Sequence, residues 1–367
     1  MEKKTLGEHF APKFDHLSYI RVFEGCNLHC AHCFIPKNPK RMSHDDVAAA
    51  GRKLKEIAEP GQTVMIQWHG GEPTLFGAEW MRQAIEALHA NTQGLTLKHA
   101  IQTNLMTFDE DWAQLYHDHF ESKIGVSWDP VIRMMPGARA ETNALYEEKF
   151  WNQIEAVKAA NIEPDFVVTA TKPFFERFKS AFSLFEFFSN KGIRYIHIER
   201  LTYSGYAKTN WDTIGVSNYE YSTNMARLLR SYSAWRENNR DKQTSISPFD
   251  GLLIACQELE SHPKAYGCWS TMCDKRFHTF DANGYQPGCT ALTAEPLFPT
   301  NTSFDLLISK ERAERQRKTC QTCKFRSICS TGCVSVSMDD GSGECAGSRR
   351  LFESALFLTE NDKGISL

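Results

Sequence analysis

The chain has 367 residues, a length that suits two domains or one large domain with an extension. It carries 42 basic and 45 acidic side chains, and the formal net charge of −3 gives no reason to expect a nucleic-acid or membrane partner. The longest apolar runs fall well short of a membrane span, and the segment MEKKTLGEHF is too polar for a secretory signal. We therefore expect a cytoplasmic protein.

Short strand-like runs alternate with longer stretches of helical period from residue 17 to about residue 201. The expected strands are short, rich in Val, Ile and aromatic residues, and bounded by polar or turn residues: LSYIRVF (17–23), VMIQWH (64–69), KHAIQTN (98–104), KIGVSWD (123–129), DFVVTAT (165–171) and RYIHIERL (194–201). The first helix between them is typical, because Ser43 can cap it and Val47 and Leu54 recur at helical spacing.

Strict alternation of strand and helix predicts an α/β fold with a parallel sheet and right-handed crossovers. Six units are too few for the usual eight-stranded barrel, so we predict a partial (β/α)6 barrel rather than a doubly wound sheet. In either fold the chemistry gathers at the C-terminal ends of the strands. The polar and cysteine-rich segments of this chain fall at those ends.

Twelve cysteines are many for such a chain, and eleven of them fall in two places, three at 26–33 and eight at 268–345. Because no export signal is present, their C-x2-C spacings favour metal ligation over disulfides. Cys256 lies alone in the apolar segment GLLIACQEL and is expected to be an inert core residue.

The first cysteine group follows the first expected strand and reads CNLHCAHC, with Cys26, Cys30 and Cys33 as its cysteines. A closed zinc or iron-sulfur site wants four protein ligands, whereas three leave one coordination position open for something exchangeable. The alternative is a zinc knuckle that His29 or His32 completes.

With the segment Gly70-Gly71-Glu72-Pro73 at the end of the next strand, this loop resembles the radical S-adenosylmethionine (SAM) superfamily. The resemblance implies that the three cysteines hold a 4Fe-4S cluster whose fourth iron binds SAM. One electron then cleaves SAM to methionine and a 5′-deoxyadenosyl radical, which abstracts a hydrogen atom from the substrate. His32 stands where the family usually has an aromatic residue against the adenine, and a flat imidazole can also stack.

The same resemblance assigns the contacts to SAM. The two glycines are expected to let the main chain approach the ligand, and the carboxylate of Glu72 suits its amino group. Further polar contacts to the ribose and the carboxylate of SAM are expected from strand-end residues: Asn104, Ser127, Asp129 and Glu199. The alternative is that each of these side chains only caps the end of its strand, and GGEP by itself often marks an ordinary turn.

Residues 202–247 hold an amphipathic helix around NMARLLRSYSAW and are expected to bridge two domains, 1–245 and 246–367. The second cysteine block resembles the SPASM extension, which in radical SAM enzymes carries two auxiliary 4Fe-4S clusters. By similarity to the anaerobic sulfatase-maturing enzymes, the first cluster has Cys268, Cys273, Cys289 and Cys333, and the second has Cys320, Cys323, Cys329 and Cys345. Two zinc sites of four thiolates each are the alternative. The expected cofactors are SAM and three 4Fe-4S clusters.

SPASM-bearing enzymes mostly act on peptides or proteins, so the resemblance favours a maturase that installs a cross-link, a thioether or an oxidised side chain. Formylglycine formation on a sulfatase is less favoured, because Thr290 stands where those enzymes carry a catalytic Asp directly after the third cysteine. Asp281 is a substitute base candidate, although a carboxylate in FDANG often forms a turn. Two further candidate functions are a small-molecule dehydrogenase acting on a sugar or amino acid, and a zinc-binding adaptor.

For a maturase, the expected partners are a peptide or protein substrate and an electron donor such as flavodoxin or ferredoxin. Only 25 residues precede Cys26 and few follow Cys345, so we expect no fused leader-peptide-binding domain of roughly 80 residues. A separate leader-binding protein is therefore a further candidate partner, and neither nucleic acid nor a membrane is expected.

Overall fold

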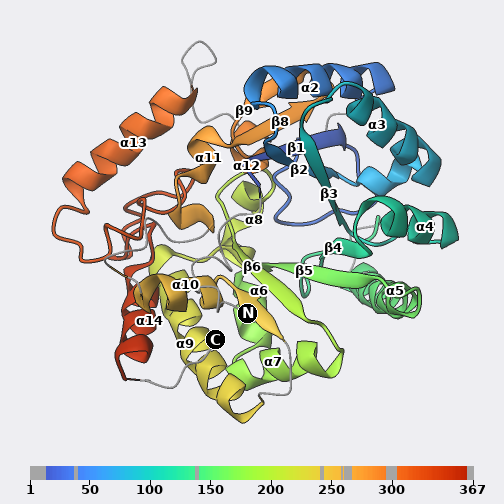
Figure 1. Cartoon of the computed structure of the whole chain (residues 1–367). Helices are drawn as coiled ribbons and strands as arrows, with labels where there is room; N and C mark the ends of the chain where they lie inside the picture. The colour runs from blue at the N-terminus through green and yellow to red at the C-terminus, as the bar shows by residue number, and fades with distance from the viewer. Residues whose placement is uncertain are drawn as a thin grey trace, which may run out of the picture.

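The computed structural model describes residues 14–36, 40–136, 140–239, 244–257, 259, 267–294 and 304–361. Within them a nine-stranded sheet runs in the order β7-β6-β5-β4-β3-β2-β1-β8-β9, with helices covering its outer side (Figure 1). The sheet supplies a row of strand ends along one edge, and this edge positions the candidate site.

The six expected strands are confirmed, and they pair in parallel in chain order: β1 (His16–Phe23), β2 (Thr63–Gly70), β3 (Thr96–Thr103), β4 (Lys123–Ser127), β5 (Glu163–Ala170) and β6 (Tyr195–Arg200). Helices connect successive strands, as parallel pairing requires. The partial α/β barrel expected from the sequence is therefore confirmed.

Three further strands extend this sheet beyond the six. The short β7 (Ser245–Ser247) pairs with β6, and β8 (Phe277–Asp281) pairs in parallel with β1 and in antiparallel with β9 (Gly284–Pro287). The cysteine-rich C-terminal part thus contributes strands to the same sheet as the barrel. The division of the chain at residue 245 stays a prediction.

Side chains alternate sharply between the two faces of the central strands. On β2, Val64, Ile66 and Trp68 are fully buried, whereas the residues that alternate with them, among them Gln67 and His69, are partly exposed. The apolar face packs under the outer helices, and the polar face is turned to the inside of the curved sheet. The inner face is therefore the side that can hold a polar ligand.

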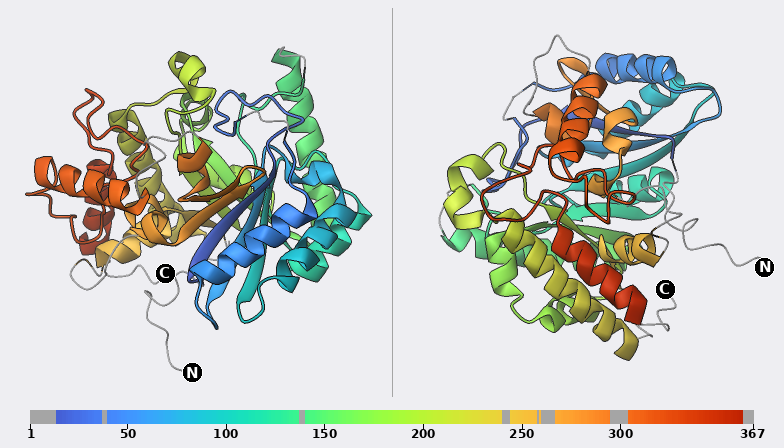
Figure 2. Two further views of the ribbon diagram at one scale, coloured as in Figure 1. Left: turned by 90° about the horizontal axis from the view of Figure 1, so that it is seen from above. Right: turned by 90° about the vertical axis from the view of Figure 1, so that its left-hand side faces the viewer.

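The helices of the described residues are α2 (His44–Ile57), α3 (Ala78–Ala90), α4 (Glu110–His119), α5 (Ala140–Ala159), α6 (Lys172–Arg177), α7 (Ala181–Asn190), α8 (Ala207–Ile214), α9 (Asn218–Asn238), α10 (Phe249–Gln257), α11 (Met272–Lys275), α12 (Thr290–Ala294), α13 (Phe304–Lys318) and α14 (Arg349–Asn361), with short 3-10 turns at Pro73–Phe76 and Gly267–Trp269. The expected helix around NMARLLRSYSAW is α9. It lies beside α14, as both Figure 1 and the right-hand view of Figure 2 show.

Local signals account for the first helix and for the isolated cysteine. Ser43 caps α2 through a hydrogen bond from the backbone N–H of Asp46, and the carboxylate of Asp46 in turn accepts from the backbone N–H of Ser43. Cys256 is buried within α10, as expected. None of the described helices is both long and apolar enough to cross a membrane.

Candidate active site

The cysteine loop is fastened directly to the glycine pair that follows β2. The backbone N–H of Gly71 donates to the carbonyl of Phe23 at 2.8 Å, and that of Glu72 donates to the carbonyl of Gly25 at 3.0 Å. A Cβ on Gly71 would lie 2.3 Å from the Gly25 oxygen, and one on Gly70, whose φ is 142°, would lie 2.2 Å from the Phe23 oxygen. In the structure, the two glycines thus allow close approach to the backbone that leads into Cys26.

We expect Gly71→Ala to deprive the three-cysteine loop of its iron, because the added methyl group must displace the main chain at Gly25. Overpacking of this kind costs about 1–3 kcal/mol. Iron content after anaerobic reconstitution measures the effect. Gly77→Ala is the control, since its φ of 84° strains the backbone while nothing lies within 4 Å of the new Cβ. Equal iron loss in both variants would contradict the explanation.

Two other segments hold the far side of the loop. The backbone N–H groups of His29 and Ala31 donate to the carbonyls of Met134 and Ile132 at 2.8 and 3.0 Å. After β6, Tyr206 donates its N–H to the carbonyl of Cys33 at 2.9 Å. The loop is therefore fixed by segments that follow β2, β4 and β6.

Hydrogen-bond donors surround the sulfur atoms of the loop. Cys26 Sγ accepts from the backbone N–H of Leu28 at 3.4 Å and from Asn104 Nδ2 at 3.6 Å, and Cys30 Sγ accepts from Arg133 at 3.7 Å. Burial is the main cause that raises the pKa of Cys26 to about 11 and that of Cys30 to about 12. Bare thiols here stay protonated at neutral pH, whereas metal ligation deprotonates them.

This donor set fits an iron-sulfur cluster, because N–H groups directed at thiolate sulfur stabilise and tune such clusters. Among the described residues, no three His, Cys, Asp or Glu side chains converge closely enough to hold a single metal ion. A four-iron cluster does not require such convergence, since each thiolate ligates a different iron. The ligand roles of the three cysteines stay predictions.

Glu72 lies fully buried at the end of β2, where protein donors occupy its carboxylate. Oε1 accepts from the backbone N–H and hydroxyl of Thr74 at 3.1 and 2.7 Å and from the Thr103 hydroxyl at 2.7 Å. Oε2 accepts from the backbone N–H of Asn104 at 2.7 Å. Burial nevertheless raises the pKa of this carboxyl. In this arrangement Glu72 joins the ends of β2 and β3 through hydrogen bonds. Glu72 also caps the 3-10 turn that begins at Pro73.

Asp129 is also fully buried, and its carboxylate organises the surroundings of the loop. It accepts from Arg133 Nε at 2.8 Å, lies 2.7 Å from Arg133 Nη2, and accepts from the backbone N–H of Thr169. His32 Nε2 lies 3.5 Å away. Burial lowers the pKa of His32 to about 4, so its ring is neutral. Asp129 thus positions Arg133 against Cys30. The sequence analysis missed this role, although Asp129 and Arg133 stand four residues apart in the sequence.

The other expected SAM contacts are distributed along the strand ends. Asn104 Nδ2 donates to Asn27 Oδ1 at 2.8 Å, so this amide lies against the cysteine loop. Ser127 Oγ accepts from Gln102 Nε2 at 2.8 Å on the inner face. Glu199 lies apart from them, beside the C-terminal cysteines. Its contact with SAM stays a prediction.

The eight C-terminal cysteines come together as two groups of four. In the first group, Cys268 and Cys333 share a hydrogen bond that lowers the pKa of Cys333, and Arg312 donates to Cys273 Sγ at 3.2 Å. Burial chiefly, and then Cys333, raises the pKa of Cys289 to about 12. We call this set, Cys268, Cys273, Cys289 and Cys333, the first auxiliary group.

We call Cys320, Cys323, Cys329 and Cys345 the second auxiliary group, because these side chains also influence one another's pKa. Burial, then Cys345 and Cys323, raise the pKa of Cys320. A Cβ on Gly347 would lie 3.1 Å from Cys329 Sγ and 3.6 Å from Cys345 Sγ, so both sulfur atoms border one small space. Electrostatic interactions link cysteines within each set. The assignment of the eight cysteines to two clusters, and iron in them, stay predictions.

An aromatic row on the inner face connects the cysteine loop with the first auxiliary group. Phe34, next to Cys33, stacks on His69 with ring centroids 6.4 Å apart, and His69 meets the edge of Tyr19 at 6.1 Å. Tyr19 is in register with Thr279 of β8, whose hydroxyl donates at 2.9 Å to the carbonyl of Gly288, the residue before Cys289. Burial chiefly, and then Cys289, raise the pKa of Tyr19. The two cysteine sites therefore border the same interior face.

Asp281, the base candidate from the sequence, is occupied by structural partners. Its carboxylate accepts from Arg21 at 2.6 Å, from the backbone N–H of Asn283 at 2.7 Å and from Gln286 Nε2 at 3.1 Å. Both Arg21 and Asp281 are buried, and their ion pair joins β1 to β8. Such a carboxylate holds the sheet together and is poorly placed to accept a substrate proton.

We expect Asp281→Ala to lower the free energy of unfolding by about 3 kcal/mol, because the change removes the carboxylate that hydrogen-bonds the buried Arg21 guanidinium and leaves it with Glu24 at 3.4 Å. Denaturant unfolding of the metal-loaded protein measures the loss. Asp118→Ala, which removes the partly exposed pair with Arg82, is the matched control and should change stability little. A stable Asp281→Ala protein with normal iron content but no product would instead support the role as a base.

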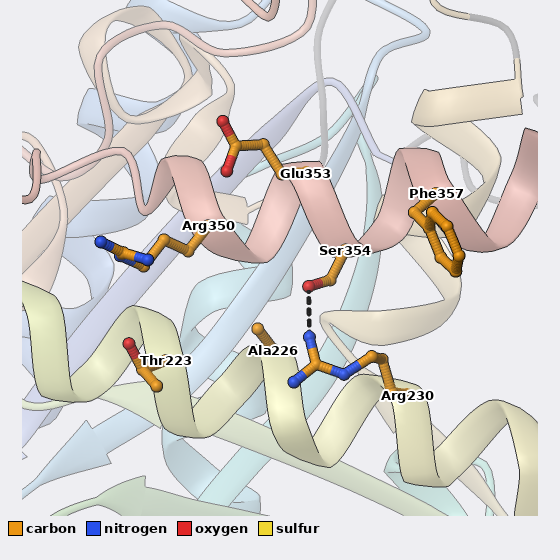
Figure 3. Close-up of a pocket in the computed structure, with 7 residues that line it drawn as sticks. All are labelled: Thr223, Ala226, Arg230, Arg350, Glu353, Ser354 and Phe357. Carbon is orange, nitrogen blue, oxygen red and sulfur yellow. Dashed lines mark hydrogen bonds between the residues drawn. The ribbon is translucent and has the colours of Figure 1, made fainter.

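A surface groove of about 280 Å³ lies between α9 and α14 (Figure 3). Its lining residues are Thr223, Ala226, Arg230, Arg350, Glu353, Ser354 and Phe357. Arg230 donates to Ser354 Oγ across it at 2.7 Å. None of the expected site residues lines this groove, so it is separate from the candidate active site.

Comparison with known proteins agrees with this geometry. Residues 20–171 match the Radical SAM superfamily and therefore form a radical SAM domain. The chain is 22% identical to the cysteine-type anaerobic sulfatase-maturating enzyme of Clostridium novyi over 330 residues, 84% of each chain. It is 27% identical to the serine-type enzyme of Klebsiella pneumoniae over 110 residues, 28% of each chain.

Solved structures support the fold. The structure of native anSMEcpe with bound AdoMet and Cp18Cys peptide superposes with a TM-score of 0.70 and 20% identity, covering 94% of this chain and 96% of that one. Streptococcus suis SuiB bound to precursor peptide SuiA gives a TM-score of 0.58 and 17% identity, with coverage of 88% and 72%. The chain therefore contains a radical SAM domain and is homologous to anaerobic sulfatase-maturating enzymes, and this similarity supports SAM and a 4Fe-4S cluster as cofactors.

Proposed function

We propose that this enzyme oxidises a side chain of a peptide or protein substrate. Cys26, Cys30 and Cys33 would hold the cluster that binds SAM, and the two auxiliary groups would each hold a further 4Fe-4S cluster. When bound, SAM and the reduced cluster supply a 5′-deoxyadenosyl radical that takes a hydrogen atom from a substrate C–H bond. A one-electron donor such as flavodoxin or ferredoxin, and a separate leader-binding protein, are further parts of the proposal.

One observation carries this proposal: the cysteine loop and the first auxiliary group border the same interior face, joined by Phe34, His69 and Tyr19. A substrate held on that face would lie between a site of hydrogen abstraction and a site able to accept an electron. Loss of a hydrogen atom, a proton and an electron is a two-electron oxidation. The relatives named above, which are maturases, favour a peptide substrate.

Sulfatase maturation is the second candidate, favoured by the similarity to the Clostridium novyi enzyme over 84% of both chains. The absence of an Asp at position 290 counts against it, because Thr290 is a poor base. A dehydrogenase of a small sugar or amino acid is the third candidate.

The test is to incubate the anaerobically reconstituted enzyme with SAM, dithionite and synthetic peptides that carry a single Ser or a single Cys. We expect 5′-deoxyadenosine together with a peptide that has lost two hydrogen atoms, or with the aldehyde that hydrolysis of an oxidised Cys yields. Free sugars and amino acids are tested in parallel. Oxidation of a small molecule while every peptide stays unchanged would overturn the proposal.

A further inference from the structure

Four of the five carboxylates near the ends of β1, β2, β4, β6 and β8 are buried, namely Glu24, Glu72, Asp129 and Asp281. Glu72, Asp129 and Asp281 accept the hydrogen bonds described above, and Glu24 lies 3.4 Å from Arg21. Glu199 differs from all of them, because 47% of its side chain is exposed. It is therefore the carboxylate of this set that a substrate can reach.

Glu199 is held by a short chain of hydrogen bonds from β6 and β7. Ser247 Oγ lies 2.9 Å from His197 Nδ1, and His197 Nε2 lies 3.1 Å from Glu199 Oε2. The backbone N–H of Arg200 donates to Oε1 at 3.0 Å. Nearly half of the Glu199 side chain is exposed, yet the protein around it partly dehydrates the carboxylate, which by itself would raise the pKa. The hydrogen bond and charge of His197 and this N–H outweigh that effect and lower the pKa. The carboxylate is thus ionised and fixed in direction.

The end of β6 lies against the cysteine-rich C-terminal part, because Arg200 donates to the carbonyl of Ala346 at 2.6 Å. The charge of Glu199 acts on the first auxiliary group from this position. After the larger effect of burial, Glu199 is among the charges that raise the pKa of Cys289 and of Tyr19. Thr290, which follows Cys289, is buried, and its hydroxyl has no hydrogen-bond partner among the described residues. A threonine hydroxyl cannot accept a proton at neutral pH as a carboxylate can.

We infer that Glu199 is the group that takes the substrate proton, with His197 and Ser247 as positioning residues. This inference rests on the proposed function in the form in which a Ser or Cys side chain is oxidised, a reaction that the second candidate shares and for which Glu199 would replace the base missing at Thr290. For a Ser side chain, the β-C–H and O–H bonds break and a C=O bond forms. The hydrogen atom goes to the 5′-deoxyadenosyl radical, the hydroxyl proton goes to Glu199, and the remaining electron goes to the cluster of the first auxiliary group. For a Cys side chain, the S–H proton takes the same path.

The test uses Glu199→Gln with the Ser or Cys peptide that the wild type oxidises, deuterated at the β-carbon. Deuterium should still appear in 5′-deoxyadenosine, because abstraction precedes proton loss. Oxidised peptide per 5′-deoxyadenosine should fall about a hundredfold or more, the usual range for loss of a general base. Glu176→Gln, at an exposed glutamate on α6, is the control. An unchanged ratio of oxidised peptide to 5′-deoxyadenosine in Glu199→Gln would overturn the inference.

The positioning role is tested at His197. His197→Ala should lower the same ratio, and His197→Asn, which keeps an N–H donor, should restore part of it. A purely structural role would affect deuterium transfer and peptide oxidation equally, and equal losses would therefore argue against positioning.

A second measurement requires no substrate. Removing the negative charge in Glu199→Gln should raise the reduction potential of the cluster in the first auxiliary group, and Glu176→Gln should not. If the wild type oxidises no peptide, the proposed function fails and the potential still decides the placement of Glu199. An unchanged potential would overturn that placement.

Discussion

Anaerobic reconstitution should load about twelve iron and twelve sulfide per chain, because eleven cysteines are predicted to form one set of three ligands and two sets of four. Replacing Cys26, Cys30 and Cys33 together by Ala should leave about eight of each and abolish cleavage of SAM. The remaining iron belongs to the two auxiliary groups, which share no residue with the loop. Colorimetric iron and sulfide assays and the formation of 5′-deoxyadenosine measure these effects.

Cys256→Ala is the matched control, because Cys256 is a buried cysteine on α10 that belongs to none of the three sets. It should keep the full iron content and normal cleavage of SAM. A purified protein with stoichiometric zinc and no iron would contradict the assignment. So would a triple variant that retains all of its iron.

The strands of the barrel were predictable because their signals are local. Short apolar runs such as Val64 to Trp68 bury every second residue under the helices, and this period is written in the sequence. Helix α2 likewise begins directly after its N-cap Ser43, whose capping box lies within four residues. In both cases neighbouring residues alone determine the structure.

Contacts between distant parts of the chain could not be predicted from such local signals. Strand β8 joins β1 across more than 250 residues, and the buried pair of Arg21 with Asp281 exists only because of that pairing. The sequence analysis therefore considered Asp281 as a free base. The position on which the proposed role of Glu199 rests was hidden for the same reason, since the effect of its charge on Cys289 depends on how the C-terminal part folds against the barrel.

The glycine pair shows a related limit. Gly70 and Gly71 were expected to admit a ligand, and in the structure they admit the backbone of Phe23 and Gly25. Both explanations require a missing side chain, so sequence alone does not separate them. The packing partner became visible only once β1 and β2 were placed side by side.

We expect Cys289→Ala to cleave SAM and yet fail to complete the product. The cluster of the first auxiliary group would lose a ligand, whereas the cysteine loop and its supports at Gly71 and Arg133 lie elsewhere in the chain. A substrate radical formed near Tyr19 would then have no nearby electron acceptor. The assay is 5′-deoxyadenosine and oxidised peptide measured in the same reaction, with Cys256→Ala as the control.

The physical state of the Cys289→Ala protein separates an electron relay from a purely structural cluster. Loss of a structural metal site removes several kcal/mol of folding free energy in small metal-held domains and leads to aggregation. Here β8 and β9 remain attached to the sheet through β1 and the Arg21–Asp281 pair, so we expect a soluble and monodisperse variant. Size-exclusion chromatography checks this expectation. Normal product from Cys289→Ala would refute the relay, and aggregation of the variant would favour the structural role.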